Sequence, residues 1–254
     1  MNKATRLSAA GLLLVMVVFA ASDVFAALSL EGRYWSTDLN SRIRIANGYS
    51  AGTEFNPVDD LGFKEKNKFW EVRAALGSDS NKVRYAYVPF QWSATTNLSR
   101  SIDFNGQTYS ASTQVNSELD IKYHRLGWES SKADKSGSKV GFIFDIKYFD
   151  ITASMQAPAA GLNEEKSLQA VVPTLGFVLQ IALPYQISVG GEVTGVSAAS
   201  DKYMIDAEAV ASMKLAGFLT ASAGYRVLKV HLEQDGNIGA FTLKGPFALL
   251  KAEF

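Results

Sequence analysis

The last ten residues, GPFALLKAEF (245–254), decide the fold class of this chain. Ala248, Leu250, Ala252 and Phe254 fall on one face of an extended strand, because successive side chains of a strand point to opposite faces. The opposite face carries Lys251 and Glu253. Chain ends usually fray, yet this alternation runs to the final residue. The stretch therefore predicts a terminal strand that is held by a partner strand.

The same alternation recurs upstream in segments separated by turn signals, which is the pattern of half-buried strands. One segment, 171–183, is apolar on both faces and contains Pro173. In another the phase slips near Val227–Leu228, as a β-bulge would make it slip. We predict about ten strands, within a range of eight to twelve, and the segments that indicate them are 29–36, 68–76, 82–88, 117–124, 141–149, 171–183, 185–193, 204–211, 219–227 and 245–254.

The N-terminus has the features of a secretory signal peptide. Lys3 and Arg6 precede a short apolar run, GLLLVMVVFAA, and Val24 and Ala26 fit the small-residue rule of a cleavage site. The run is shorter than the ~20 residues of a membrane-spanning helix. We therefore expect residues 1–26 to be a cleaved leader and 27–254 to form one domain.

The composition excludes several classes of protein. The chain has 254 residues, 25 basic against 25 acidic, so nothing indicates a nucleic-acid partner. It has no cysteine, so disulfides do not stabilise the exported domain. A large core or a closed sheet must do so instead.

Two all-β architectures fit the alternation: a soluble periplasmic β-sandwich and a membrane barrel. The apolar faces are rich in aromatic residues such as Trp70, Tyr85 and Trp128, which resemble the girdles at membrane interfaces. The connectors alternate between long and short, as in outer-membrane barrels. These features favour an up-and-down antiparallel transmembrane β-barrel. Its last strand must pair with its first, because an unpaired edge in lipid costs several kcal/mol for each group.

The terminal strand resembles that of Gram-negative outer-membrane β-barrel proteins, and the wider layout is similar to a group of small uncharacterised outer-membrane barrels. Leu250, Ala252 and Phe254 fit the C-terminal assembly signal of such proteins. The resemblance implies an outer-membrane location and recognition by the barrel-assembly machinery. It is nearly silent on activity.

The polar faces predict a lumen filled with charged side chains of both signs. Such charges must pair, because an isolated buried charge costs several kcal/mol. The network is interpreted as a structural plug, or alternatively as the lining of a narrow, porin-like polar pore or ligand pocket. Its expected members are Glu71, Arg73, Arg84, Glu118, Asp120, Lys122, His124, Asp145, Lys147, Glu192, Asp206, Glu208 and Arg226, with Lys251 and Glu253 on the same face of the last strand.

The connector 37–66 is the most distinctive loop, with GTEFNPVDDLGF at its centre. It is expected to be a long loop that could fold into the barrel mouth as a plug, with Asp59 and Asp60 meeting basic lumen residues. Two acids alone are a weak metal signal, so we expect no metal and no cofactor.

His231 raises the possibility of an enzyme. Glu233 lies two residues on, on the same face, and Asp59 and Asp60 could supply a second acidic pair, which resembles part of the acid/histidine arrangement of barrel proteases. A histidine beside a carboxylate at the rim of an ordinary strand is the simpler interpretation. The sequence thus predicts a monomeric barrel surrounded by outer-membrane lipids, with a structural or interaction role or a narrow pore; an enzyme acting on lipid A or peptides is the alternative.

Overall fold

The computed structural model describes residues 27–47, 49–199, 202–234 and 236–254, so the expected leader, residues 1–26, lies outside the described part. Among the described residues no helix is long and apolar enough to cross a membrane. Most of them belong to long strands: β1 (Ala27–Arg44), β3 (Lys66–Gly77), β4 (Asn81–Asn97), β7 (Gln114–Ala133), β8 (Lys139–Ala157), β9 (Leu162–Leu183), β10 (Ile187–Ala199), β11 (Lys202–Ala216), β12 (Leu219–Gln234) and β13 (Asn237–Glu253).

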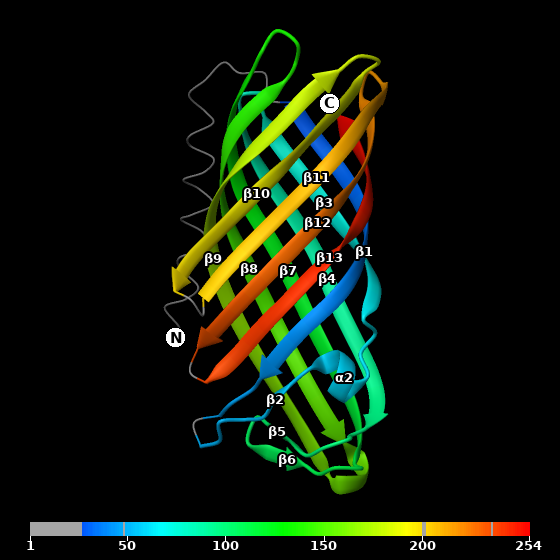
Figure 1. Ribbon diagram of the computed structural model, residues 1–254, viewed down its shortest axis with the longest axis vertical. Coiled ribbons are helices and arrows are strands. Elements are labelled where there is room, and N and C mark those ends of the chain that lie inside the picture. The colour runs from blue at the N-terminus through cyan, green and yellow to red at the C-terminus, as the bar shows by residue number, and fades with distance from the viewer. Residues whose placement is uncertain (1–26, 48, 200–201, 235) are drawn as a thin grey trace.

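These ten strands form one antiparallel sheet that closes on itself, because β13 pairs with β1 (Figure 1). At the end of the seam, the Leu28 amide donates to the Phe254 carbonyl at 3.1 Å and the Phe254 amide donates to the Leu28 carbonyl at 2.8 Å. The prediction of an up-and-down barrel of about ten strands is therefore confirmed. The alternative, a β-sandwich, is wrong, since a sandwich requires two separate packed sheets.

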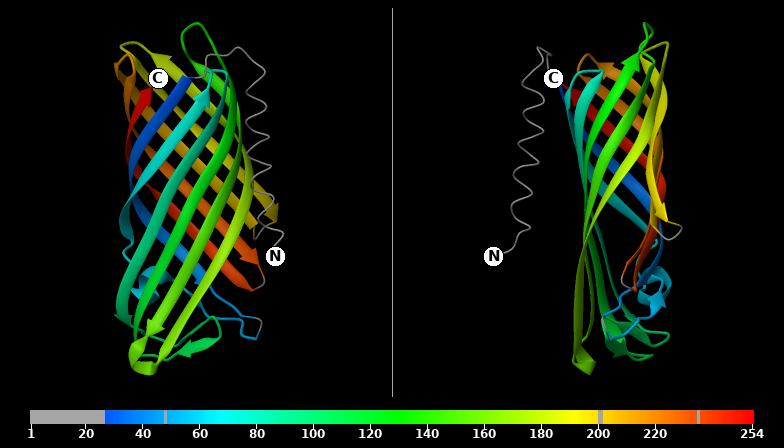
Figure 2. Two further views of the ribbon diagram at one scale, coloured as in Figure 1. Left: turned by 180° about the vertical axis from the view of Figure 1, so that it is seen from behind. Right: turned by 90° about the vertical axis from the view of Figure 1, so that its left-hand side faces the viewer.

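The two ends of the barrel differ (Figures 1 and 2). Both described chain ends and the short connectors 78–80, 134–138, 184–186 and 217–218 lie at one end, which we call the turn end. The opposite loop end carries the two longest connectors, 45–65 and 98–113. Strands β7, β8 and β9, of 20, 19 and 22 residues, extend furthest toward the loop end.

Each strand keeps its period of two but exchanges the polarity of its faces partway along. On β8 the inward side chains change from Asp145 and Lys147 to Phe149 and Ala153. We call the height of this exchange the crossover level. The outward side chains of the same strand are Phe142, Phe144, Ile146 and Tyr148 before that level and Asp150, Thr152 and Ser154 beyond it.

Aromatic rings gather on the outer surface at the crossover level. The rings of Tyr34 and Trp70 lie 4.8 Å apart, and the Tyr85 hydroxyl lies 2.8 Å from His124 Nδ1. Amphipathic rings favour the boundary between lipid and water. The crossover level therefore marks where the apolar outer band ends, and the part of the barrel nearer the loop end projects beyond that band.

The exchange of faces corrects two expectations about the strands. The predicted bounds of connector 37–66 are wrong at the N-terminal side, because β1 continues to Arg44 with polar side chains pointing outward. No bulge occurs at Val227–Leu228, where the pairing of β12 with both neighbours is continuous. Val227 is the last apolar outward residue before the crossover level, and Leu228 is the first apolar inward residue beyond it, so both are apolar.

Connectors cover the loop end. They contain β2 (Glu54–Phe55), α2 (Pro57–Leu61), β5 (Ile102–Phe104), β6 (Gln107–Tyr109) and the single turn η2 (Pro158–Ala160). Asn56 caps α2 by accepting from the Val58 amide at 3.0 Å, and Gly62 ends it at φ 74°, a conformation that favours glycine. Their buried apolar side chains join the core of the barrel: Phe55, Leu61, Phe63, Ile102, Phe104 and Tyr109.

Candidate functional site

The first ion-pair cluster lies inside the barrel at the crossover level. Arg226 from β12 contacts Asp206 through Nε at 2.8 Å and Nη2 at 2.9 Å, and Glu71 through Nη1 at 3.0 Å. Lys147 Nζ reaches the same Asp206 at 3.1 Å and donates to Thr194 Oγ1 at 2.7 Å. This set, the Arg226 cluster, consists of Arg33, Glu71, Arg73, Lys147, Asp206, Glu208 and Arg226.

A second cluster lies nearer the turn end. Arg84 contacts Glu129 at 2.9 Å and Glu192 at 2.7 Å. Arg125 contacts Glu192 at 2.6 Å and Asp145 at 2.7 Å. This set, the Arg84 cluster, consists of Lys82, Arg84, Arg125, Glu129, Lys139, Asp145 and Glu192.

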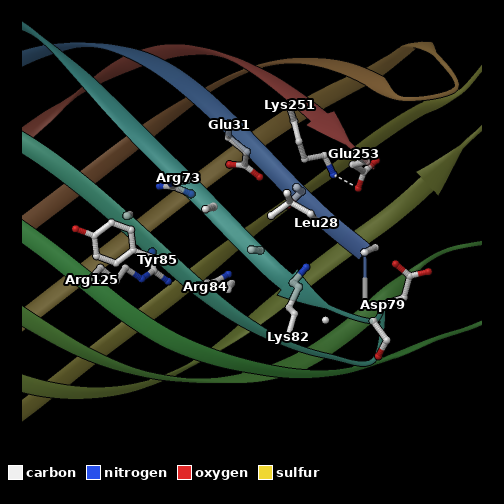
Figure 3. A pocket seen from close by; sticks show the side chains of 17 residues that line it. Leu28, Glu31, Arg73, Asp79, Lys82, Arg84, Tyr85, Arg125, Lys251 and Glu253 are labelled. Atoms are coloured by element: carbon white, nitrogen blue, oxygen red, sulfur yellow. Dashed lines mark hydrogen bonds and ion pairs between the residues drawn. The ribbon is translucent and has the colours of Figure 1, made fainter. Parts of the chain in front are cut away.

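The side chains of the two clusters are packed inside the lumen. Arg33 and Glu71 are 1% exposed, and Asp145, Lys147 and Arg226 are 0% exposed. From the turn end, a vestibule of about 120 Å³ leads only as far as Arg73, Arg84 and Arg125 (Figure 3). Aromatic rings pack against the first cluster: the Arg33 guanidinium lies 3.8 Å from the Phe247 ring centre, and that of Arg226 lies 4.8 Å from the Trp35 ring centre.

Beyond the crossover level the interior is apolar and contains a larger cavity of about 350 Å³, which we call the loop-end chamber. It shares no lining residue with the vestibule of the turn end. Strands from both sides of the barrel form its wall, including Leu39 and Ile43 of β1, Trp92 of β4, Leu168 and Ala170 of β9, and Val230, Leu232 and Phe241 of β12 and β13.

Nine of the thirteen residues expected in the lumen network lie in the two clusters: Glu71, Arg73, Arg84, Asp145, Lys147, Glu192, Asp206, Glu208 and Arg226. Lys251 and Glu253 pair with each other at 2.8 Å beside the turn-end vestibule. Leu250 and Phe254, from the expected assembly signal, are 56% and 71% exposed on the outer face, which Ala252 shares.

For Glu118, Asp120, Lys122 and His124 the expected lumen position is wrong. These side chains of β7 point outward, whereas Leu119, Ile121 and Tyr123 are buried inside. Glu118, for example, accepts from Gln91 Nε2 at 2.8 Å on the exposed surface. The reason is that this part of β7 lies beyond the crossover level, where water is outside the barrel and the apolar core is inside.

The sequence also missed lumen residues, namely Arg33, Lys82, Arg125, Glu129 and Lys139. Arg125 and Glu129 share the face of Leu119 and Ile121, so a single face assignment for β7 placed them outside. The detectable signal was the change from apolar to charged residues along that one face.

The structure does not bring the proposed catalytic residues together. The His231 ring stacks on Tyr203 at 5.5 Å on the outer face, and we find no hydrogen bond between His231 and Glu233 in the described part of the chain. Asp59 accepts from Asn56 Nδ2 at 2.6 Å. In place of a lumen cation, Asp60 contacts Arg100 of the neighbouring loop at 2.9 Å.

Two loop-end groups have shifted pKa values that show how the connectors are held. The hydrogen bond from Arg100 holds the pKa of the Asp60 carboxyl below its usual range. Burial raises the pKa of the Tyr109 hydroxyl to about 12, and that hydroxyl donates to the Met155 carbonyl at 2.6 Å. Within the described residues no group of three or more His, Cys, Asp or Glu side chains could hold a metal ion.

Comparison with known proteins gives a likeness of fold. No family model and no curated protein sequence matches the chain. The outer membrane protease OmpT from Escherichia coli is similar in structure, with a TM-score of 0.54 and 10% identity over 92% of this chain and 98% of that one. The β domain of the Bordetella autotransporter BrkA has a TM-score of 0.47 and 13% identity, covering 90% of this chain and 100% of that one.

The attachment invasion locus protein Ail of Yersinia pestis has a TM-score of 0.39 and 8% identity, covering 90% of this chain and 99% of that one. At 10% identity the likeness to OmpT concerns the fold alone. That fold agrees with the closed seam between β1 and β13 and with the apolar band around the outside of the turn-end half. The chain is therefore a closed antiparallel β-barrel of ten strands, the fold of outer-membrane barrel proteins.

Proposed function

We propose that this protein is a sealed, non-conducting barrel with a structural or interaction role at the cell surface, and not a pore. The observation that carries the proposal is the burial of the Arg226 cluster, in which Arg33 and Glu71 are 1% exposed and Lys147 and Arg226 are 0% exposed. Permeation needs a continuous path for water and solute. The paired side chains occupy the barrel at this height.

The paired charges explain why a barrel of this size can be closed by polar groups. Small barrels have interiors that side chains fill, and a buried charge is tolerated only when it is paired and hydrogen-bonded. Asp206, for example, is shared by Arg226 and Lys147. In this proposal the loop end faces the outside of the cell, the barrel is a monomer surrounded by lipid, and the assembly machinery engages the last strand.

Single-channel recording in planar bilayers tests the proposal. The wild-type barrel should give no stable conductance steps, whereas Arg33→Ala combined with Glu208→Ala should increase leakage, because it removes a paired cation and anion from the Arg226 cluster. A heat-dependent shift in gel mobility checks that each variant is folded, and protease protection checks its insertion. Large, stable conductance steps from the wild-type protein would overturn the proposal.

A further inference from the structure

We infer that the loop-end chamber binds a single hydrocarbon chain that carries an anionic head group. The chamber has a volume of about 350 Å³, within the ~300–1,000 Å³ typical of ligand pockets. The walls are mainly aliphatic and aromatic, with Leu168 and Ala170 on one side and Val230 and Phe241 on the other. Apolar cavities of this kind stay dry and take up apolar ligands.

The position of the chamber argues against a purely structural role. It lies beyond the crossover level, where the outward side chains are polar, so its apolar lining does not serve contact with lipid. In the turn-end half, by contrast, paired side chains fill the lumen. The barrel thus leaves an apolar space open in the half that projects beyond the apolar outer band.

The sheet offers an entrance to the chamber from the side. The pairing of β9 with β10 that the structure describes ends at Leu175↔Gly195, although β9 continues to Leu162. The chamber is lined from β9 by residues 166 and 168–172 and from the facing strands by residues such as Lys202 and Leu232. Toward the loop end, β9 diverges from β10, β11 and β12 in Figure 2. Pro173 lies just beyond the last described pair and has no backbone N–H to donate to a ladder.

The polar groups at the chamber favour an anionic head group. Lys166 lines the chamber from β9 and Lys202 lines it from β11, so the two lysines come from opposite sides of the place where these strands diverge. Neither forms an ion pair within the described part of the chain. Of the described residues, Glu233 is the one acidic residue that lines the chamber, and it lies on the outward face of β12 with His231, so cations outnumber acids there. A carboxylate or phosphate head could pair with the lysines while its chain fills the apolar space.

Tryptophan quenching by a bromine-labelled long-chain carboxylate tests this inference. The protein is held in lipid nanodiscs, because detergent chains would themselves compete for the chamber. Trp70 and Trp128 face outward, so the reporter protein carries Trp70→Phe and Trp128→Phe, which leaves Trp92 at the chamber and Trp35 below it. We expect saturable quenching that is lost in Trp92→Phe.

Matched variants locate the site. Ala170→Phe should fill the chamber and weaken binding by at least about tenfold, whereas Ser167→Phe, which changes an outward residue of the same strand, should not. If Ala170→Phe fails the gel-shift test of folding, Ile43→Phe fills the chamber from β1. Lys166→Met combined with Lys202→Met should weaken binding of the carboxylate roughly tenfold and leave binding of the matched bromo-alcohol unchanged. Lys122→Met, which removes a lysine elsewhere, is the charge control and should change neither.

The inference would be overturned if quenching rose linearly with probe concentration and was the same in the wild-type reporter and in the Ala170→Phe and Ile43→Phe variants. Such quenching would report only partition of the probe into lipid. Equal affinity for carboxylate and alcohol would overturn the anionic head group. A brominated phospholipid in the disc that quenches Trp92 without free carboxylate would identify a membrane lipid as the source of the chain. This inference rests on the proposed interaction role of the barrel. A barrel that conducts but still binds the probe would refute the proposed non-conducting barrel and leave the proposed ligand site standing.

Discussion

Replacing Arg226 with methionine should strongly destabilise the barrel. Arg226 contacts Asp206 at 2.8 and 2.9 Å and Glu71 at 3.0 Å. Because its side chain is 0% exposed, water cannot replace these contacts when the side chain is removed. Methionine fills much of the same space, so the main effect is that two buried carboxylates each lose one cation. Asp206 keeps Lys147, and Glu71 keeps Arg33 and Arg73. Removing one partner of a buried pair costs about 3–5 kcal/mol.

The assay is equilibrium urea unfolding of the refolded barrel, followed by tryptophan fluorescence. Lys122→Met, on the outer face of β7, is the control and should change the free energy of unfolding by no more than about 0.5 kcal/mol. Adding Asp206→Asn to Arg226→Met should cost less than the sum of the single changes, by about 0.5–3 kcal/mol. A loss below about 1 kcal/mol for Arg226→Met, or one equal to that of the control, would refute the buried-pair argument.

Three further predictions test other parts of the structure. Because the natural chain has no cysteine, Glu118→Cys should react with a membrane-impermeant maleimide on intact cells and Leu119→Cys should not; the reverse pattern would refute the exchange of faces on β7. Asp60 has a lowered pKa in the folded protein, so its contact with Arg100 stabilises the loop-end connectors fully at pH values above the unfolded pKa of about 3.9. This stabilisation is lost as the pH falls through the lower folded pKa. Hydrogen exchange of residues 54–63, corrected for intrinsic rates, should show the loss, and Asp60→Asn should abolish the pH step. Phe254→Ser should reduce the heat-shifted, folded fraction in the outer membrane, whereas the outward substitution Thr242→Ser should not; equal yields would show that the terminal aromatic is dispensable for assembly.

The strand content of this protein could be predicted because alternation reports local geometry. A period of two appears wherever one face is buried and the other is not, whichever face that is. The stretch 245–254 thus predicted a paired C-terminal strand, and the hydrogen bonds between Leu28 and Phe254 are that pairing. Segment 171–183 is the part of β9 that begins at the crossover level and runs along the apolar outer band, where alternate residues from Val171 to Leu183 are exposed.

The side on which water lies could not be predicted from a single segment. The segment SELDIKYH (117–124) alternates as clearly as GFIFDIKYF (141–149), yet its charged residues face out, while Asp145 and Lys147 face in. Both patterns are consistent with a strand between an apolar and a polar surface. Only the height of each residue relative to the outer band distinguishes them.

The sequence by itself predicted the strands and a number of about ten, because these follow from alternation and turn residues, and it favoured closure, because a terminal strand needs a partner. The tertiary structure alone decided which charges meet. Glu71 and Arg226 are 155 residues apart in the chain, and their pairing depends on the strand register around the barrel. It also decided that the seal and the loop-end chamber lie at different heights, because the surroundings of the barrel change from lipid to water along its axis and the same face of a strand must change with them.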